Sequence, residues 1–192
     1  MLEPVSALAG ETTPRAFGPD LALAERRIGP VWQLAAWPDR LPKAAAAVAA
    51  AAGVKTAPGP LRAVDGGGKG ASGARLLRVE PLKWWLVTEA SSPPDTPDAP
   101  DMGGAGAVLD LSHSWTVIRV EGARAPDLMA RAAPLDLRPR AFPEGSVATS
   151  AIHHVSVTVD ARAGGFDLYC PRGFALSLWE HLCEIAEQFA VS

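Results

Sequence analysis

The chain has 192 residues, which is enough for one domain of ordinary size or for two small halves that share a core. Hydrophobic residues make up 48% and charged residues 20%, which is typical of a globular protein and excludes wholesale disorder. The formal net charge of -3 gives no general attraction to nucleic-acid phosphates or anionic lipid, so neither is an expected partner.

The N-terminal sequence is unlike a secretory signal, because Glu3 precedes any basic residue and no apolar core follows. The longest apolar run, residues 44–54, is mostly alanine and too short to span a bilayer. The chain has only two cysteines, Cys170 and Cys183, which rules out a four-sulfur metal site and favours a reducing compartment; one disulfide between them stays open. We therefore expect a cytoplasmic protein without membrane contact.

Residues 1–27 are expected to form a loosely held N-terminal arm, followed by a first α+β half over residues 28–90. That half opens with the strand-like run IGPVWQLAAW, which Pro38 ends. The alanine-rich run KAAAAVAAAAG then predicts a helix that Gly53 caps. After a loop over residues 57–73, the runs RLLRVE and WWLVTE predict two short strands.

A linker rich in Pro, Asp and Gly is predicted over residues 91–107, before a second half over residues 108–192. The run AVLDLSHSWTVIRVEG predicts one strand, and APDLMARAAP predicts a short helix. The run HHVSVTVD predicts a half-buried strand with Val155, Val157 and Val159 on its core face. A helix is predicted over GFALSLWEHLCEIAEQF, where apolar residues recur at helical spacing.

Both halves therefore follow the order strand, helix, strand, strand, with a final helix on the second half. This order predicts an α+β fold of two strand-helix-strand-strand halves, with mainly antiparallel sheets covered by helices.

The stretch LDLSHSW contains the residue types of a hydrolase, namely Asp110, Ser112, His113 and Ser114. In an extended strand Ser112 and Ser114 would share a face with Asp110, whereas His113 would point to the opposite face. A nucleophile and its base must lie within hydrogen-bond reach, which this strand alone cannot supply. Ser146, in EGSVA, lacks the second glycine of a G-x-S-x-G elbow. We interpret the stretch as structural, its polar groups bonded to neighbouring backbone, and assign no catalytic residue.

Residues 68–73, GKGASG, match the pattern G-x-G-x-x-G letter by letter. A dinucleotide-binding turn requires a strand before the glycines and a helix after them, but here a loop precedes and the strand-like ARLLRVE follows. Gly70 also occupies the position at which a phosphate-binding loop carries Ser or Thr. The sequence therefore predicts a flexible loop without a nucleotide.

The other histidines have structural interpretations. His153 and His154 are expected to face opposite ways in a strand, so that they cannot chelate one metal ion together. His181 is expected to be a solvated partner of Glu184 in the last helix.

Cys183 is expected in the core, whereas Cys170, at a strand end, is an unsupported candidate for a reactive thiol.

Trp84 and Trp85 must point to opposite faces of their strand. Either another subunit covers one of these faces, or helices cover both.

Three runs point to one family: DLSHS (110–114), PLDL with PRAFP (134–143), and YCPRGFA (169–175) leading into Leu178-Trp179. Through them, residues 108–189 resemble the gamma subunit of bacterial heterotetrameric sarcosine oxidase, while the first half agrees in element order alone. More distantly, DLSH followed by a strand, Glu-Gly and a short helix looks like the folate-binding fold of the aminomethyltransferase (T-protein), of which the gamma subunit is a reduced form.

The resemblance implies a noncatalytic subunit of a flavoenzyme complex that demethylates sarcosine oxidatively to glycine, giving hydrogen peroxide and either formaldehyde or 5,10-methylenetetrahydrofolate. It implies that FAD, FMN, NAD, zinc and tetrahydrofolate bind to partner subunits and none to this chain. The implied partners are the alpha, beta and delta subunits, chiefly the large subunit with the folate domain. No catalytic, cofactor-binding or metal-binding residue is carried over to this chain.

Two other functions stay open: a free-standing tetrahydrofolate-binding protein of the T-protein superfamily, and a subunit of a related N-methyl amine demethylase. The first is disfavoured because the chain is short for a folate-binding architecture and lacks the K-G-C-Y-x-G-Q-E motif of folate-dependent repair proteins. An independent hydrolase using Ser112 or Ser114 with His113 is disfavoured by strand geometry.

Overall fold

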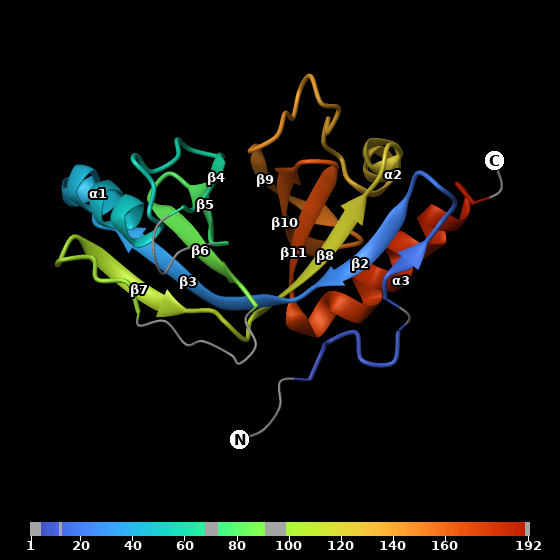
Figure 1. The fold of residues 1–192 in the computed structure, drawn as a ribbon, viewed down its shortest axis with the longest axis horizontal. Helices are drawn as coiled ribbons and strands as arrows, with labels where there is room; N and C mark the ends of the chain where they lie inside the picture. The colour runs from blue at the N-terminus through green and yellow to red at the C-terminus, as the bar shows by residue number, and fades with distance from the viewer. Residues whose placement is uncertain (1–4, 12, 68–72, 91–98, 191–192) are drawn as a thin grey trace. The chain divides into compact units, whose positions relative to one another are not determined.

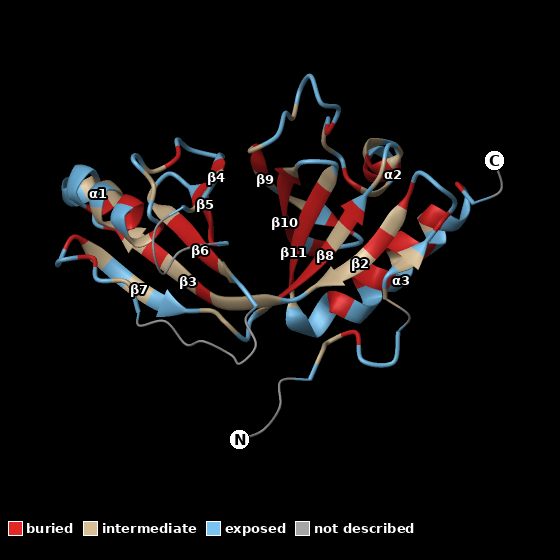
Figure 2. Ribbon diagram, in the orientation of Figure 1, coloured by how far each residue is buried: buried red, intermediate tan, exposed pale blue. Residues whose placement is uncertain are grey.

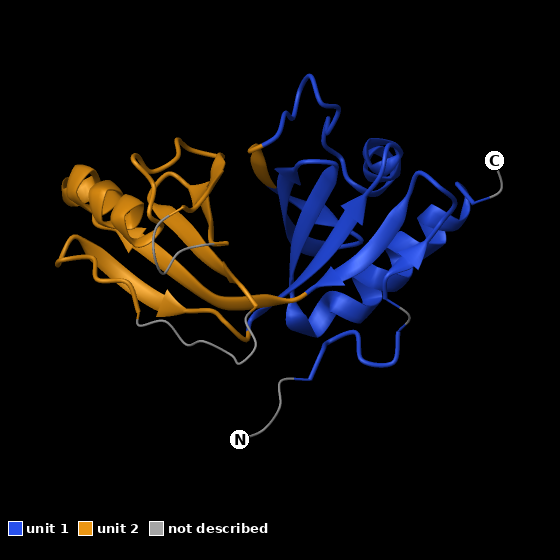
Figure 3. Cartoon of the chain, viewed as in Figure 1, with its two compact units in different colours: residues 1–26, 114–144, 149–192 blue, residues 27–113, 145–148 orange. Residues whose placement is uncertain are grey.

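The computed structural model describes residues 5–11, 13–67, 73–90 and 99–190. The chain divides into two compact units, coloured separately in Figure 3: unit 1 comprises residues 1–26, 114–144 and 149–192, and unit 2 comprises residues 27–113 and 145–148. Neither unit is one continuous stretch of sequence, because the chain passes from one unit to the other four times.

A six-stranded sheet forms the centre of unit 1, and α2 and α3 accompany it (Figure 1). In spatial order its strands are β1 (Arg15–Ala16), β2 (Ala22–Arg26), β8 (Trp115–Glu121), β11 (Gly165–Pro171), β10 (Val155–Arg162) and β9 (Val147–Ile152). The helices are α2 (Ala125–Ala132), the short 3-10 turn η2 (Arg172–Phe174) and α3 (Ala175–Glu187).

The core of unit 1 lies between one face of this sheet and the two helices. Alternate residues along the strands, such as Ile118 and Leu168, pack with Leu128 of α2 and with Leu178 and Leu182 of α3, and all five are fully buried. The alternating apolar side chains of the strands therefore pack against the apolar side of α3, whose residues recur in the sequence at helical spacing. The predicted core face of β10 is confirmed, because Val155, Val157 and Val159 belong to the same cluster.

The predicted N-terminal arm is part of unit 1 in the structure. Leu8, Phe17, Leu21 and Leu23 are at most 4% exposed and belong to its core. The reason is strand pairing: β2 lies antiparallel to β8, with Leu23 opposite Val120, and this pairing carries the N-terminal apolar side chains into the core. Strands β1 and β2 therefore extend the sheet of unit 1.

Unit 2 contains a five-stranded antiparallel sheet with one helix. In spatial order the strands are β4 (Ala63–Asp65), β5 (Arg75–Glu80), β6 (Lys83–Glu89), β3 (Ile28–Ala36) and β7 (Gly106–Asp110). The 3-10 turn η1 (Pro38–Arg40) leads into α1 (Leu41–Ala51). Ala44 and Val48 of α1 pack on Leu34, Leu76 and Trp84 of the sheet, because alanine lets a helix approach closely.

The predicted α+β class with antiparallel sheets and helices is confirmed, but local predictions within residues 107–122 and 153–160 are wrong. The run from residue 107 to 122 is not one strand, because β7 ends at Asp110, β8 begins at Trp115, and the two strands belong to different sheets. The strand β10 is not half-buried either, since Thr158 and Asp160 on its polar face are at most 3% exposed (Figure 2).

Of the predicted linker over residues 91–107, the part from 91 to 98 lies outside the described residues, and Gly106 already belongs to β7. None of the helices in the described ranges is long and apolar enough to cross a membrane.

Candidate functional site

Ser112 lies in the turn that follows β7 and bridges it to β3. Its backbone N–H donates to Asp110 Oδ1 at 2.8 Å, and its hydroxyl donates to the same oxygen. The hydroxyl also accepts the N–H of Val31, at a nitrogen–oxygen distance of 3.1 Å. Because the proton of the hydroxyl goes to a carboxylate rather than to an imidazole, this serine has the contacts of a structural bridge.

The Ser112 bonds also set the charge of Asp110. The side-chain and backbone hydrogen bonds from Ser112 hold the pKa of this carboxyl below its ordinary value, and the nearby charge of His113 lowers it slightly further. Asp110 is therefore an ionised hydrogen-bond acceptor at neutral pH.

Ser114 and Ser146 have hydrogen-bonded surroundings of their own. Ser114 belongs to unit 1, where its carbonyl accepts the N–H of Arg172 at 2.9 Å. Ser146 is buried in unit 2, and its hydroxyl accepts a hydrogen bond of 2.8 Å from Arg62 Nη1.

Most of the predicted glycine loop, residues 68–72, lies outside the described residues. Gly73 has a φ of 79°, and β5 follows it directly from Arg75. A strand therefore takes the place of the helix whose N-terminus a dinucleotide phosphate would need, so the described residues around this loop do not fit a nucleotide.

The prediction that His153 and His154 lie in a strand is wrong. They form the two-residue turn between β9 and β10, and both have positive φ, 49° and 63°. His181 of α3 is half-buried rather than solvated, and its ring stacks on that of His153. Sequence alone places these two rings 28 positions apart.

Both cysteines are free and buried. The thiol of Cys170 donates to the Thr116 carbonyl at 3.6 Å, and burial raises its pKa to about 12. Burial likewise raises the pKa of Cys183, which lies in the core as predicted. Since the thiolate is the nucleophile, Cys170 does not have the environment of a reactive thiol at neutral pH.

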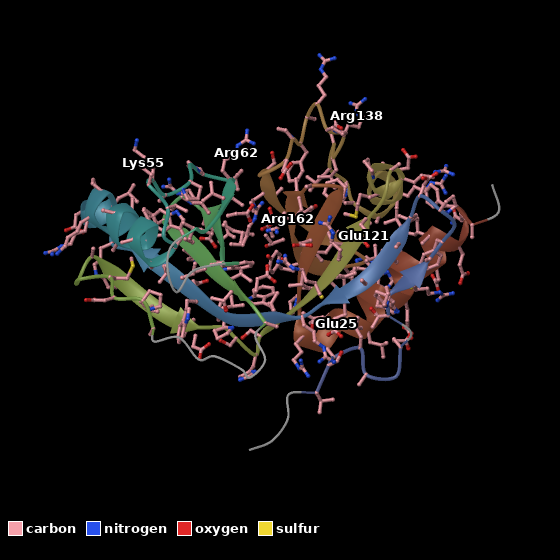
Figure 4. The ribbon with its side chains drawn as sticks, in the orientation of Figure 1. Glu25, Lys55, Arg62, Glu121, Arg138 and Arg162 are labelled. Carbon is pink, nitrogen blue, oxygen red and sulfur yellow. The ribbon has the colours of Figure 1, made fainter. Side chains whose placement is uncertain are left out.

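A group of buried charges on β11 and its neighbours was not predicted from the sequence. The carboxylate of Asp167 is 1% exposed and forms ion pairs with three arginines: Arg119 Nη1 at 3.4 Å, Arg162 Nε at 3.9 Å, and Arg26 Nη1. Register explains the first pair, because Asp167 lies directly opposite Arg119 in the sheet. We call these four residues the Asp167 cluster; Figure 4 labels Arg162.

Tyr169 and Asp160 are buried near the Asp167 cluster. Burial raises the pKa of Tyr169 strongly, and the charges of Asp160 and Asp167 raise it further. The phenol therefore stays protonated at neutral pH. The arginines around the Asp167 carboxylate join neighbouring strands of the sheet, and the neutral phenol lies beside them.

A shallow pocket of about 580 Å³ lies at one end of the same sheet. The β1–β2 turn, the end of β8 and the β10–β11 turn line it, mostly with glycine and alanine. Its charged residues are Arg119 and Glu121, whose Nε and Oε2 are 3.5 Å apart; Figure 4 labels Glu121. Arg119 also donates to the carbonyl of Ala163 at 2.6 Å, so protein acceptors already engage its guanidinium.

Across the described part of the chain, no three His, Cys, Asp or Glu side chains converge so that they could hold a metal ion. The fold is an α+β scaffold in two units, and the polar side chains described above bond to turns, neighbouring strands and ion-pair partners.

Comparison with known proteins finds a solved structure with a similar fold. No protein-family model and no curated protein matches the sequence. Among solved structures, a chain of the heterotetrameric sarcosine oxidase from Corynebacterium sp. U-96, in complex with pyrrole 2-carboxylate, is similar with a TM-score of 0.75 and 26% sequence identity. The alignment covers 97% of this chain and 93% of that chain. The resemblance to heterotetrameric sarcosine oxidase is confirmed, and it extends through both predicted halves.

Proposed function

We propose that this chain is the noncatalytic gamma subunit of a heterotetrameric sarcosine oxidase-like complex. The complex would demethylate sarcosine oxidatively to glycine, with hydrogen peroxide as the oxygen product. The one-carbon unit would leave as formaldehyde or as 5,10-methylenetetrahydrofolate. In this role the chain contributes a folded surface to the assembly.

One observation carries the proposal: nearly the whole of this chain aligns with nearly the whole of one chain of such an oxidase. An alignment of that extent includes residues of both units, so it is more than a shared motif. The side chains support the noncatalytic part, since Ser112 is a hydrogen-bonded bridge and Cys170 is a buried, protonated thiol.

The proposed partners are the alpha, beta and delta subunits, chiefly the large subunit with the folate domain. FAD, FMN, NAD, zinc and tetrahydrofolate would bind to those subunits and not to this chain. We place the complex in the cytoplasm, a compartment that the two free thiols fit because it keeps cysteines reduced.

Purification of the tagged chain from its native cells tests the proposal. We expect larger subunits to co-elute, a flavin absorbance spectrum in the eluate, and hydrogen peroxide production that depends on added sarcosine. A colourless, solitary chain would contradict the proposal, and titration with tetrahydrofolate would then test the free-standing folate-binding alternative. A flavin-bearing assembly that oxidises another N-methyl amine but not sarcosine would identify a related demethylase.

Substitution of Ser112 tests the noncatalytic role inside the assembled complex. We expect Ser112→Ala to leave the turnover number per flavin unchanged, with Ser114→Ala as the matched control. Loss of turnover in Ser112→Ala alone, at normal flavin content and normal subunit ratio, would show that this chain takes part in the chemistry.

A further inference from the structure

Two histidines form the tight turn between β9 and β10. His153 and His154 both adopt the left-handed backbone region, which two-residue hairpin turns require and which glycine and asparagine enter most easily. The flanking residues Ile152 and Val155 are buried in the core of unit 1 and fix the strands on either side. The turn therefore holds two ring-bearing residues in a strained conformation that other contacts must offset.

A ring stack joins this turn to α3. The ring centroids of His153 and His181 lie 4.3 Å apart, with 21° between their planes. The ring of His154 lies 6.1 Å from that of His153 and is tilted by 49°. On the helix side, His181 is half-buried and directly precedes Leu182, which belongs to the core. The stack thus connects a surface turn to a helix anchored in the core.

The surroundings of the stack disfavour protonation of His181 when His153 is already charged. The turn contributes His153 and His154, and α3 contributes Glu184, whose carboxylate favours a charged His181. Burial and then the charge of His153 oppose it, and together they hold the pKa of His181 below its ordinary value. His153 is exposed and His181 is half-buried, and two imidazolium rings at this separation repel each other.

Three neighbouring histidines also suggest a metal site, but they do not converge as metal ligands do, and no three metal-binding side chains converge elsewhere in the described residues. Proton binding is the chemistry that fits a stacked pair.

We propose that the His153–His181 stack is an acid-sensitive latch that fastens the β9–β10 turn to α3 and releases it when both rings are protonated. Above the ordinary imidazole pKa of about 6.5, at least one ring is neutral and the stack holds. Below that pH the released form binds more protons than the latched form. The stabilisation from the stack is therefore lost as the pH falls from about 6.5 toward the lower pKa of the folded state.

NMR titration of the imidazole groups in the full-length chain tests the latch. The chain has four histidines, and His113, in unit 2, is the internal reference. We expect His181 to titrate below the ordinary imidazole pKa, because of its burial and the neighbouring His153. We also expect the turn amides, corrected for intrinsic rates, to exchange severalfold faster at about pH 5 than at about pH 7.

Two asparagine variants of the same turn separate the latch from a purely structural effect. Asparagine tolerates positive φ, so both variants keep the backbone conformation. His153→Asn removes the stack, and we expect the pKa of His181 to rise and the pH dependence of exchange to disappear. His154→Asn leaves the stack in place, and we expect both properties to stay as in the unmodified chain. His181→Gln tests the same contact from the helix and should behave like His153→Asn.

Three outcomes would overturn the latch. The first is an unchanged pKa of His181 in His153→Asn. The second is turn exchange that does not depend on pH in the unmodified chain. The third is equal loss of the pH dependence in His153→Asn and His154→Asn. Added Zn²⁺ that shifts all three clustered histidines at stoichiometric concentration would replace the latch with a metal site.

Discussion

Asp167 carries a buried charge that pairs with three arginines of unit 1. Its carboxylate is buried at the meeting point of the arginines on β2, β8 and β10. We expect Asp167→Asn to lower the free energy of unfolding by about 3 kcal/mol, because it removes the buried carboxylate charge from three guanidinium groups that are themselves partly buried. Urea denaturation followed by circular dichroism measures this.

The matched control is Asp136→Asn on the loop after α2. Asp136 also forms a close pair, with Arg138, but that pair is open to solvent, and Figure 4 shows Arg138 extending away from the ribbon. We expect an unchanged midpoint, because water screens exposed ion pairs. Equal destabilisation by the two substitutions would mean that burial is not what gives the Asp167 cluster its strength.

Ser112→Ala would affect stability and the pKa of Asp110 together. We expect a loss of about 1 kcal/mol at neutral pH, because the N–H of Val31 loses its acceptor. The pKa of Asp110 should rise toward 3.8, since the variant loses the hydroxyl bond, which is the largest contribution that lowers it, and keeps the backbone bond.

The sign of the pH effect of Ser112→Ala follows from linkage. In the unmodified chain the Asp110 contribution is present above pH 3.8, its unfolded pKa, and is lost as the pH falls through the folded pKa. The difference between the two proteins should therefore shrink in acid. Carboxyl titration by NMR, with Ser114→Ala as the control, checks both parts, and a difference that grows in acid would contradict this assignment.

At the scale of elements, α2 and the end of α3 are joined through Phe189. Its ring is 5% exposed, with the guanidinium carbons of Arg124 and Arg131 at 4.6 Å and 4.5 Å from the centroid. We expect Phe189→Ala to lower the free energy of unfolding by about 3–5 kcal/mol through lost burial and cation–π contacts. Phe174, which is 57% exposed, gives the control Phe174→Ala, and we expect it to have little effect. Equal midpoints for the two variants in urea would contradict the role of Phe189.

Strand β6 presents one tryptophan to each face of its sheet. Trp84 is 0% exposed and packs toward α1, whereas Trp85 is 6% exposed and donates to Gln33 Oε1 at 3.3 Å. We expect Trp84→Ala to destabilise unit 2 by about 3–5 kcal/mol and to reduce the yield of the assembled complex through folding alone. Trp37→Ala is the exposed control. Full complex yield and an unchanged melting temperature in Trp84→Ala would contradict this assignment.

At the scale of the whole molecule, periodicity predicted the elements but not which sheet each one joins. Apolar alternation identified β10 and helical spacing identified α3, because both patterns are local. The sheet partner of β2 could not be read in this way, since its pairing with β8 joins residues almost 100 positions apart. For the same reason the break at DLSHS looked like continuous strand.

For the polar residues, too, the sequence indicated local features but not contacts between distant segments. The structural interpretation of Ser112 rested on alternation in a strand, whereas the structure places this serine in a turn, where its contacts are a hydrogen-bonded bridge. The Asp167 cluster was missed because its members come from four strands. The available signal was a single charge inside an otherwise apolar run, as in FDLYC and VIRV, which indicates a buried and paired charge.

Unit 1 is assembled from three separate segments, so residues 1–26 should be indispensable to it. We expect a chain that lacks residues 1–26 to lose the tertiary structure of unit 1, because Leu21 and Leu23 leave the core and β8 loses its pairing with β2. Amide exchange and near-ultraviolet circular dichroism measure this loss. A synthetic peptide of residues 1–26 should restore the native signal, whereas the same peptide with Leu21→Ser and Leu23→Ser should not. A truncated chain with native spectra and an unchanged denaturation midpoint would instead make these residues the loose arm that composition suggests.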